Sequence, residues 1–287
     1  MKKTFAKLAS AVMALALMLT CFASCAGKET KVAIGVQSGT TGESFLKGDA
    51  DWGFEGFANV DTKSYDNAGL AVEDMKNGNI KYVVIDAAVG KELAAKNKDI
   101  KVIDYALTKE DFGFGVDKAQ PELLATINKV LTEKKAEIDA IYDKFSEVND
   151  DNAADWKGET LKSAEYDANK DQLVVATNAA FAPYEFVVGN EFAGIDMEIV
   201  KLIAAELNME VVIQDMAFES VVTSIGKNGV DMAASGLTIS PARAKIVNFS
   251  NPYEEGSYQV ILAMNDDATF DDCKSAEDTL AKLKELK

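Results

Sequence analysis

The chain has 287 residues, and its 47 acidic and 30 basic residues give it a net charge of −17 at pH 7. Such acidity argues against binding to nucleic acid or to anionic lipid. The absence of histidine excludes Ser-His-Asp and Cys-His catalysis and histidine metal sites. The cysteines lack zinc spacing, and no phosphate-loop or dinucleotide fingerprint occurs, so we expect no metal and no cofactor.

The N-terminus has the pattern of a secretory signal. Lysines among residues 1–7 precede the apolar run 8–20, which is too short to span a bilayer comfortably. The segment FASC at 22–25 fits a lipoprotein cleavage box. We expect a signal peptide over 1–24 and lipid on Cys25. Ordinary cleavage at a small-residue site, with Cys25 incidental, is the alternative.

A first run of alternating strand and helix patterns follows the leader. Gly39–Gly42 should form a turn between the first strand and a helix that begins near Glu43. The alternation predicts a parallel or mixed sheet covered by helices. The expected strands are 31–37, 81–86 and 101–107, and the further helices are 66–77 and 87–96.

A short strand at 112–117 leads into two helices. Pro121 suits the first turn of one of them, and Ile138 to Phe145 mark the other by their helical spacing. Residues 146–171 are polar and acidic without a strong period, so we predict a linker there.

A second alternating run begins at 173, in the middle of the chain. We expect Asp196 to cap its first helix and Ser275 to cap a final amphipathic helix over 275–286. The expected strands are 173–177, 210–214, 230–234 and 257–263.

Polar groups that suit a free amino acid stand just after several predicted strands. A carboxylate needs a bidentate cation and N–H donors, an ammonium needs a buried carboxylate, and the carbon skeleton needs apolar walls. In open α/β sheets, ligands bind at these strand ends.

Several motifs resemble the polar-amino-acid-binding proteins of ABC importers. The run 175–256 resembles their first lobe, and 112–145 resembles their C-terminal helices. The first-lobe motifs are ATNAAFAPYEF (176–186), FAGIDMEIVKLIAAEL (192–207), DMAFESVV (215–222) and VDMAASGLTISPARAKIVNFSNPY (230–253). The runs VAIGVQSGTTGES (32–44) and VVID (83–86) resemble the second lobe.

The resemblance implies an α/β fold of two lobes, the periplasmic-binding-protein type II fold, that closes about a hinge. It also implies a family 3 solute-binding lipoprotein, anchored to the outer face of the cell membrane, that delivers an amino acid to an ABC permease. No enzyme activity is expected.

By this resemblance, Arg243 holds the ligand carboxylate through its guanidinium fork, and Asp86 holds the ammonium. Hydroxyl and backbone donors complete the carboxylate site, two phenylalanines sandwich the skeleton, and two amides line the side-chain pocket. The donors are Ser235, Gly236 and Thr238 from one lobe and Thr40 and Thr41 from the other; the phenylalanines are Phe181 and Phe218; the amides are Asn178 and Gln37.

Each of these residues has a plainer alternative role. Arg243 could pair with a surface acid, Asp86 could cap the next helix, and the Thr40–Thr41 turn could be structural. The two phenylalanines could belong to the core. The neutral amides favour a polar uncharged or moderately apolar amino acid over a strongly cationic one such as arginine.

The order of the two lobes is reversed relative to the family that the motifs resemble. Rotating the chain restores the usual order, because helix 275–286 then leads into strand 31–37. We therefore predict a circular permutation within a monomer. Domain swapping between two molecules is the alternative. The expected parts are a smaller lobe (31–108 plus 272–287), a larger lobe (113–262, including 146–171), and hinge crossovers at 109–112 and 263–268.

Two other functions stay open at this stage. A binding module of this kind could sense an amino acid without a transporter. A dehydratase-like enzyme on the same fold would need a general acid or base, and without histidine only a carboxylate such as Glu185 or Glu219 could serve.

Overall fold

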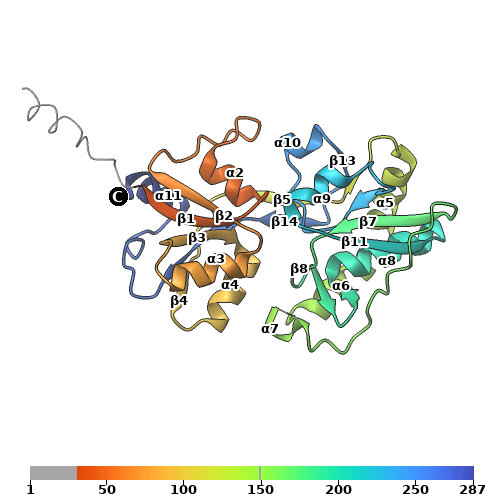
Figure 1. The fold of residues 1–287 in the computed structure, drawn as a ribbon, viewed down its shortest axis with the longest axis horizontal. Coiled ribbons are helices and arrows are strands. Elements are labelled where there is room, and N and C mark those ends of the chain that lie inside the picture. The colour runs from red at the N-terminus through yellow and green to blue at the C-terminus, as the bar shows by residue number, and fades with distance from the viewer. Residues whose placement is uncertain (1–30, 149) are drawn as a thin grey trace, which may run out of the picture.

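The computed structural model describes residues 31–148 and 150–287, without the side chains of 149–151. The expected signal peptide over 1–24 and the expected lipid site at Cys25 lie outside the described residues. Within them the chain forms two lobes, each built on a five-stranded sheet. Two strands that cross between the lobes connect them (Figure 1).

The smaller lobe contains a mixed sheet with the strand order β2-β1-β3-β15-β4. β1 is parallel to β2 and β3, whereas β15 comes from near the C-terminus and is antiparallel to β3 and β4. The central strand β3 is buried along its whole length. These strands are β1 (Val32–Gln37), β2 (Val60–Tyr65), β3 (Tyr82–Asp86), β4 (Ile100–Ile103) and β15 (Gln259–Met264).

The helices of the smaller lobe all begin at a side-chain cap, which satisfies a backbone N–H of the first turn. The last helix contributes to the core of this lobe, since Leu283 and its C-cap Leu286 share a buried cluster with Ile34. Asn59 Nδ2 also donates to the carbonyls of both leucines. The helices are α2 (Thr41–Lys47), α3 (Ala68–Lys76), α4 (Ala87–Lys96) and α11 (Ala276–Glu285).

The larger lobe repeats this sheet plan in the order β11-β7-β12-β6-β13. β7 is buried throughout and parallel to β11 and β12, and β6 is antiparallel to its neighbours. In each lobe the fourth strand is therefore an antiparallel one that enters from a crossover. The strands are β6 (Gly115–Val116), β7 (Gln172–Thr177), β11 (Glu210–Asp215), β12 (Met232–Ala233) and β13 (Asn248–Phe249), beside a hairpin of β8 (Ala180–Phe181), β9 (Glu185–Val188) and β10 (Glu191–Ala193).

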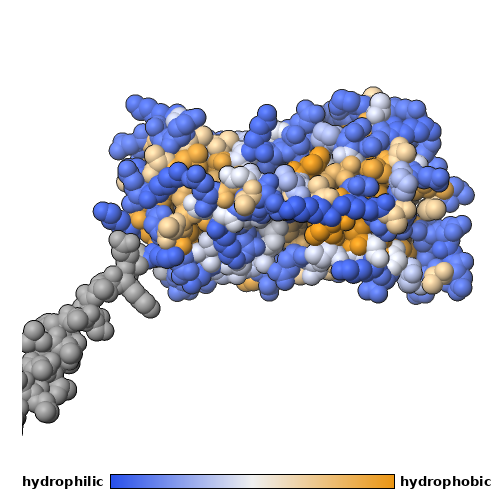
Figure 2. All heavy atoms as spheres, turned by 90° about the horizontal axis from the view of Figure 1, so that it is seen from above, coloured by the Kyte–Doolittle hydropathy of each residue, from blue (hydrophilic) through white to orange (hydrophobic). Residues whose placement is uncertain are grey.

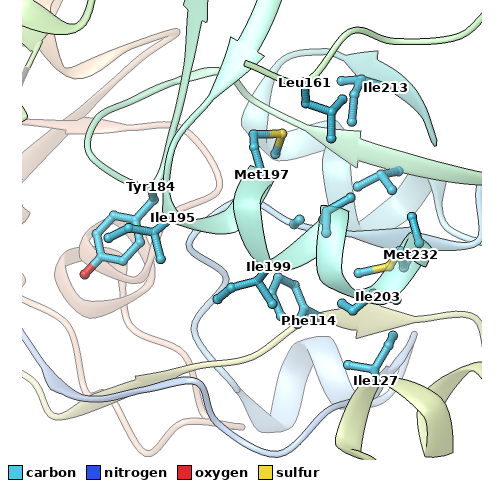
Figure 3. Packing of buried hydrophobic residues seen from close by; sticks show 14 of the residues in the cluster. Phe114, Ile127, Leu161, Tyr184, Ile195, Met197, Ile199, Ile203, Ile213 and Met232 are labelled. Atoms are coloured by element: carbon cyan, nitrogen blue, oxygen red, sulfur yellow. The ribbon is translucent and has the colours of Figure 1, made fainter. Parts of the chain in front are cut away.

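Helix α8 lies at the centre of the larger lobe's core. Figure 3 shows its residues Ile199 and Ile203 beside Phe114 and its Met197 directed toward Leu161, and all four are buried. Burying one such side chain contributes about 1.5–3 kcal/mol. The helices of this lobe are α5 (Pro121–Glu133), α6 (Lys135–Phe145), α7 (Asp150–Ala153), α8 (Ile195–Leu207), α9 (Phe218–Ser224) and α10 (Pro241–Ala244).

The two crossovers are β5 (Glu110–Phe112) and β14 (Glu254–Ser257), which pair with each other in antiparallel fashion. The first lies within one residue of the expected position. The second does not lie at 263–268, because β15 completes the sheet of the smaller lobe. The expectation that strand 257–263 belongs to the larger lobe is therefore wrong, and its apolar run reflects burial between β3 and β4.

Residues 146–171 form a packed connection along the larger lobe rather than a free linker. Trp156 stacks on Phe145 with ring centroids 4.7 Å apart, and Leu161 forms a β-bridge with Phe192. The backbone N–H of Ala164 donates to a carbonyl of β11. The sequence predicted a linker because these few apolar residues are spread among many polar ones.

Other local expectations need correction. The cap of α8 is Gly194, at φ 125°, and Asp196 lies within the first turn, fully buried. β2 was missed because only Val60 of its six residues is buried, so its sequence lacks an apolar pattern. Strand β4 ends at Ile103, short of the expected 107.

The surface is mainly hydrophilic, in keeping with the charge of the sequence. Figure 2 shows hydrophilic side chains over most of one face, with apolar groups between them on both lobes. Among the described residues, no helix is both long enough and apolar enough to span a membrane.

Candidate functional site

A cavity lies between the two lobes, next to the crossover β5. The empty space there is about 530 Å³, a figure that includes open solvent at the mouth of the cavity. All eleven predicted site residues line it, so the structure brings them together from both lobes and from both halves of the chain. The lining consists of Gln37, Thr40, Thr41, Val84, Ile85, Asp86, Glu110, Phe112, Asn178, Phe181, Phe218, Ser235, Gly236, Thr238, Arg243 and Gln259.

Arg243, on α10, is the one arginine of the whole sequence. Its Nη1 donates to the carbonyl of Thr238 at 2.9 Å, and its Nη2 donates to the carbonyl of Gly39 in the other lobe at 3.1 Å. Burial lowers the pKa of the guanidinium to about 10, and the nearby Glu110 opposes this shift. Arg243 is thus a cation at neutral pH, held at the junction of the lobes.

Asp86 stands at the end of β3 and serves two purposes. Its Oδ1 accepts a hydrogen bond from the Ala88 N–H and caps α4, while its Oδ2 accepts one from the Ser257 hydroxyl at 2.8 Å. The carboxyl is 7% exposed and lines the cavity. Burial, and then the negative charge of Glu110, raise the pKa of Asp86 to about 7. Such a carboxyl is stabilised by an incoming cation.

A chain of hydroxyl groups crosses the cleft. Thr41 Oγ1 donates to Thr238 Oγ1 at 3.1 Å, and Thr238 Oγ1 donates to Glu110 Oε2 at 2.6 Å. Thr40 is the N-cap of α2, and its hydroxyl donates to the carbonyl of Gln37. Thr41 and Thr238 therefore face each other from opposite lobes, while the Thr40 hydroxyl is engaged within its own turn.

Two of the predicted donors point away from the cavity. The Ser235 hydroxyl donates to Glu185 Oε1 at 2.9 Å, and the Gly236 N–H donates to Asp196 Oδ2 at 3.0 Å. Burial and the charge of Asp196 raise the pKa of Glu185, and burial raises that of Asp196 to about 7. The hydroxyl of Ser235 and the N–H of Gly236 thus hold the loop from behind and are not available as ligand donors in this arrangement.

The two phenylalanines line the cavity from different directions. Phe181 stacks on Tyr184, with ring centroids 5.4 Å apart, and its ring closely approaches Gly236, where a Cβ would lie 2.7 Å from it. Phe218 lies under Arg243, whose Cζ is 5.4 Å from the ring centroid. Phe218 therefore orients the guanidinium as well as forming a wall.

The two amides meet across the cleft. Gln37 Nε2 donates to Asn178 Oδ1 at 3.2 Å, and Asn178 Nδ2 donates to the carbonyl of Met216 at 2.8 Å. This end of the cavity consequently presents neutral polar groups.

Comparison with known proteins identifies much of the larger lobe. Residues 173–285 match the family model described as bacterial extracellular solute-binding proteins, family 3. Domain 1 from TmArgBP, solved in an arginine-bound form, is 32% identical over an alignment that covers 40% of this chain and 93% of that one, with a TM-score of 0.29. This segment, residues 173–285, belongs to the family 3 solute-binding proteins. The match to the family model carries the assignment.

Full-length relatives of this family 3 protein match over a similar stretch. The arginine-binding extracellular protein ArtP of Bacillus subtilis is 33% identical over 95 residues, which are 33% of this chain and 37% of that relative. ABC transporter arginine-binding protein 1 of Escherichia coli is 30% identical over 105 residues, 36% of this chain and 43% of that relative. The chain thus spans less than half the length of these two curated relatives.

The family match covers only part of the cleft. Arg243, Asn178 and the loop 235–238 lie inside residues 173–285, whereas Thr41 and Asp86 come before them. The match includes β15 and α11 of the smaller lobe, but the cavity is completed by residues of that lobe that precede the match.

Glu110 and Gln259 line the cavity but were not predicted from the sequence. Both stand where the chain passes between the lobes, on β5 and just after β14. The rule that ligands bind at the carboxyl ends of strands does not cover positions in a crossover between lobes. The one available signal was that an acidic residue, Glu110, lies within the expected crossover at 109–112.

Proposed function

We propose that this family 3 protein binds a free amino acid between its lobes, outside the cytoplasm, and delivers it to an ABC permease. The carrying observation is that Arg243 and Asp86 line one cavity from opposite lobes. A guanidinium fork suits a carboxylate, and a buried carboxyl lacking a cation suits an ammonium. Thr41 and Thr238 would add hydroxyl donors at the carboxylate end once their hydroxyls turn from the hydrogen bonds to Thr238 and Glu110 toward the ligand.

Contacts between the lobes support binding by hinge closure. Besides the Thr41–Thr238 hydrogen bond, Ser38 donates to Glu219 and Lys245 pairs with Asp51 across the cleft rim. Closure about β5 and β14 would bury the ligand.

The cavity also bears on which class of amino-acid side chain the ligand carries. The amides Gln37 and Asn178 favour a polar uncharged or moderately apolar amino acid. Two relatives, however, are named for arginine, so arginine is a necessary arm of any ligand test. Tight binding of arginine without binding of a glutamine-like ligand would overturn the preference for uncharged side chains.

Attachment and chain order belong to the same proposal. A lipid on Cys25 would anchor the smaller lobe to the membrane, only a few residues before β1. We also propose that the lobe division and the circular permutation hold within one monomer. A dimer in light scattering would favour the domain-swapped alternative.

Two alternatives differ from this proposal in the fate of the bound ligand. An amino-acid sensor would bind the same ligand without a permease, and neighbouring permease and ATPase genes would count against it. A dehydratase-like enzyme finds less support, because Glu185 is fully buried behind the loop and Glu219 accepts from Ser38 at the rim. Turnover of a bound ligand in NMR spectra would revive the enzyme.

A thermal-shift screen of the twenty amino acids tests the proposed function. A ligand at 100 times its Kd should stabilise the protein by about 2.7 kcal/mol. Arg243→Ala should abolish the shift, whereas Lys129→Ala, which removes an exposed cation paired with Glu206, should preserve it. If no amino acid stabilises the wild type, the proposal fails.

A further inference from the structure

Glu110 is a buried acid of the cavity to which the proposed function assigns no role. It is 3% exposed, and it lies on β5, where the chain passes between the lobes. It lines the cavity together with Asp86 and Arg243. A buried carboxylate in a small-molecule site calls for a partner.

The carboxylate of Glu110 is held in place by two threonines. Thr108 Oγ1 donates to its Oε1 and Thr238 Oγ1 donates to its Oε2, both at 2.6 Å. These neutral donors orient the group but bring no positive charge. Each carboxylate oxygen keeps a further acceptor site that can face the cavity.

Glu110 is also linked to Asp86 through the second crossover. Ser257 on β14 pairs in register with Glu110, and the Ser257 hydroxyl donates to Asp86 Oδ2. Gln259, two residues further on, pairs in register with Asp86 and donates its backbone N–H to the Thr108 hydroxyl. The two acids therefore border the same hinge strand.

The charges of the cavity do not balance. Among the described residues that line it, Arg243 is the one cation, set against Asp86 and Glu110. The raised pKa of Asp86, caused by burial and then by Glu110, reflects this lack of positive charge. Bringing a second cation between the acids would relieve it.

We propose that Glu110 is a second ammonium-binding residue, which shares the α-ammonium of the ligand with Asp86 and so selects amino acids over analogues lacking the amine. The inference rests on the proposed function and adds to it a residue that determines specificity. The ligand carboxylate stays with Arg243, at the other end of the α-carbon.

A different role would leave a different signature. If Glu110 only positions the Thr238 hydroxyl, its loss would weaken every ligand that carries a carboxylate, with or without an amine. If Glu110 binds the ammonium, its loss would weaken only ligands that carry the amine.

Calorimetric titration separates these roles. The ligands are the amino acid that gives the largest thermal shift and its α-hydroxy acid analogue, which keeps the carboxylate and side chain. The proteins are the wild type, Glu110→Gln and the control Glu255→Gln, which changes an exposed acid of β14 outside the cavity lining. Glu110→Asp is a second variant, which keeps the negative charge but places it on a side chain one methylene shorter. Thermal unfolding of each ligand-free variant checks its fold.

We expect Glu110→Gln to weaken the amino acid about 10- to 100-fold, and the α-hydroxy acid less than about threefold. Glu110→Asp should show a smaller loss, again confined to the amino acid, and Glu255→Gln should match the wild type. Equal losses for both ligands, or none for either, would overturn the role of Glu110 while leaving the proposed function intact. A wild type that binds no amino acid would overturn both.

Discussion

Arg243 is the residue on which the cleft depends most. Every other basic residue of the sequence is a lysine, and a lysine ammonium cannot present two parallel donors to one carboxylate. In the closed arrangement, its Nη2 donates to the carbonyl of Gly39 in the opposite lobe. The same side chain can therefore hold a ligand and the closed conformation.

Asp86 gives ligand binding a predicted dependence on pH. Its pKa is raised to about 7, first by burial and then by the charges of Glu110 and, less strongly, Glu254; the Ser257 hydroxyl and the Ala88 N–H act in the opposite direction. An ammonium ligand requires the ionised form. Below pH 7, a proton must leave Asp86 before the ligand can bind, so affinity falls as the pH falls.

We therefore expect Kd from calorimetry to be nearly constant above about pH 7.5 and to rise toward tenfold per pH unit below about pH 6.5. Asp86→Asn should bind weakly and without this slope. For the ligand-free protein the sign is reversed. The raised pKa stabilises the fold below about pH 4, and this contribution is lost as the pH rises through 7. A flat binding profile from about pH 5.5 to about pH 8.5 would refute this role for Asp86.

At the scale of elements, closure brings the turn before α2 against α9. Gly39 has φ +77°, and a Cβ built there would lie 2.8 Å from the Cα of Glu219 in the opposite lobe. Because backbone lies on the other side, no side-chain rotation can relieve that contact. A glycine at this position is thus a requirement of the closed state.

Gly39→Ala should hold the lobes apart. We expect its radius of gyration by small-angle scattering to stay at the ligand-free value when the amino acid is added, with affinity lowered at least about tenfold. Gly53→Ala is the matched control, since Gly53 has φ +74° in the same lobe but nothing within 4 Å of its Cβ position. If Gly39→Ala contracts like the wild type, this contact does not limit closure.

The sequence predicted elements well where burial left a periodic pattern. Strand β3 and the helix from Asp196 carry such patterns and appear near their expected positions. The polar edge strand β2 and the two-residue strand β13 carry none, whereas β12 lies within the expected strand 230–234. The limits of the smaller lobe were misplaced because a buried strand such as β15 reads the same in either sheet.

Site residues at strand ends could be predicted for the same reason. Asp86 and the loop after β12 follow buried strands, where ligands gather in α/β folds. The directions in which individual donors point could not be predicted, because Ser235 and Gly236 donate to acids that lie 40 or more positions away in sequence. Glu110 was missed because its place in the cavity depends on the pairing of two crossovers.

At the scale of the molecule, the first and last described residues lie near each other, as the proposed permutation requires. Lys31 and Lys287 border the same hollow of the smaller lobe. By the proposed permutation, a chain that begins at Asp150, joins Lys287 to Lys31 through a short Gly/Ser linker and ends at Val148 should place the two lobes in the order usual for the family.

We expect this rotated chain to unfold in one cooperative transition and to bind its amino acid within about threefold of the original affinity, as measured by circular dichroism and calorimetry. The reason is that rotation preserves both sheets and all of the cleft residues. A rotated chain that folds but does not bind would show that the connection between Val148 and Asp150 or the present termini take part in the site.

The most direct measurement is a calorimetric titration of the monomeric fraction, separated by size, with the amino acid that stabilises it most. One molecule bound per chain, with binding lost in Arg243→Ala, is the predicted result, because each chain closes its own cleft. No binding heat at several temperatures, or a stoichiometry of one ligand per two chains, would contradict an amino-acid site formed within a single molecule.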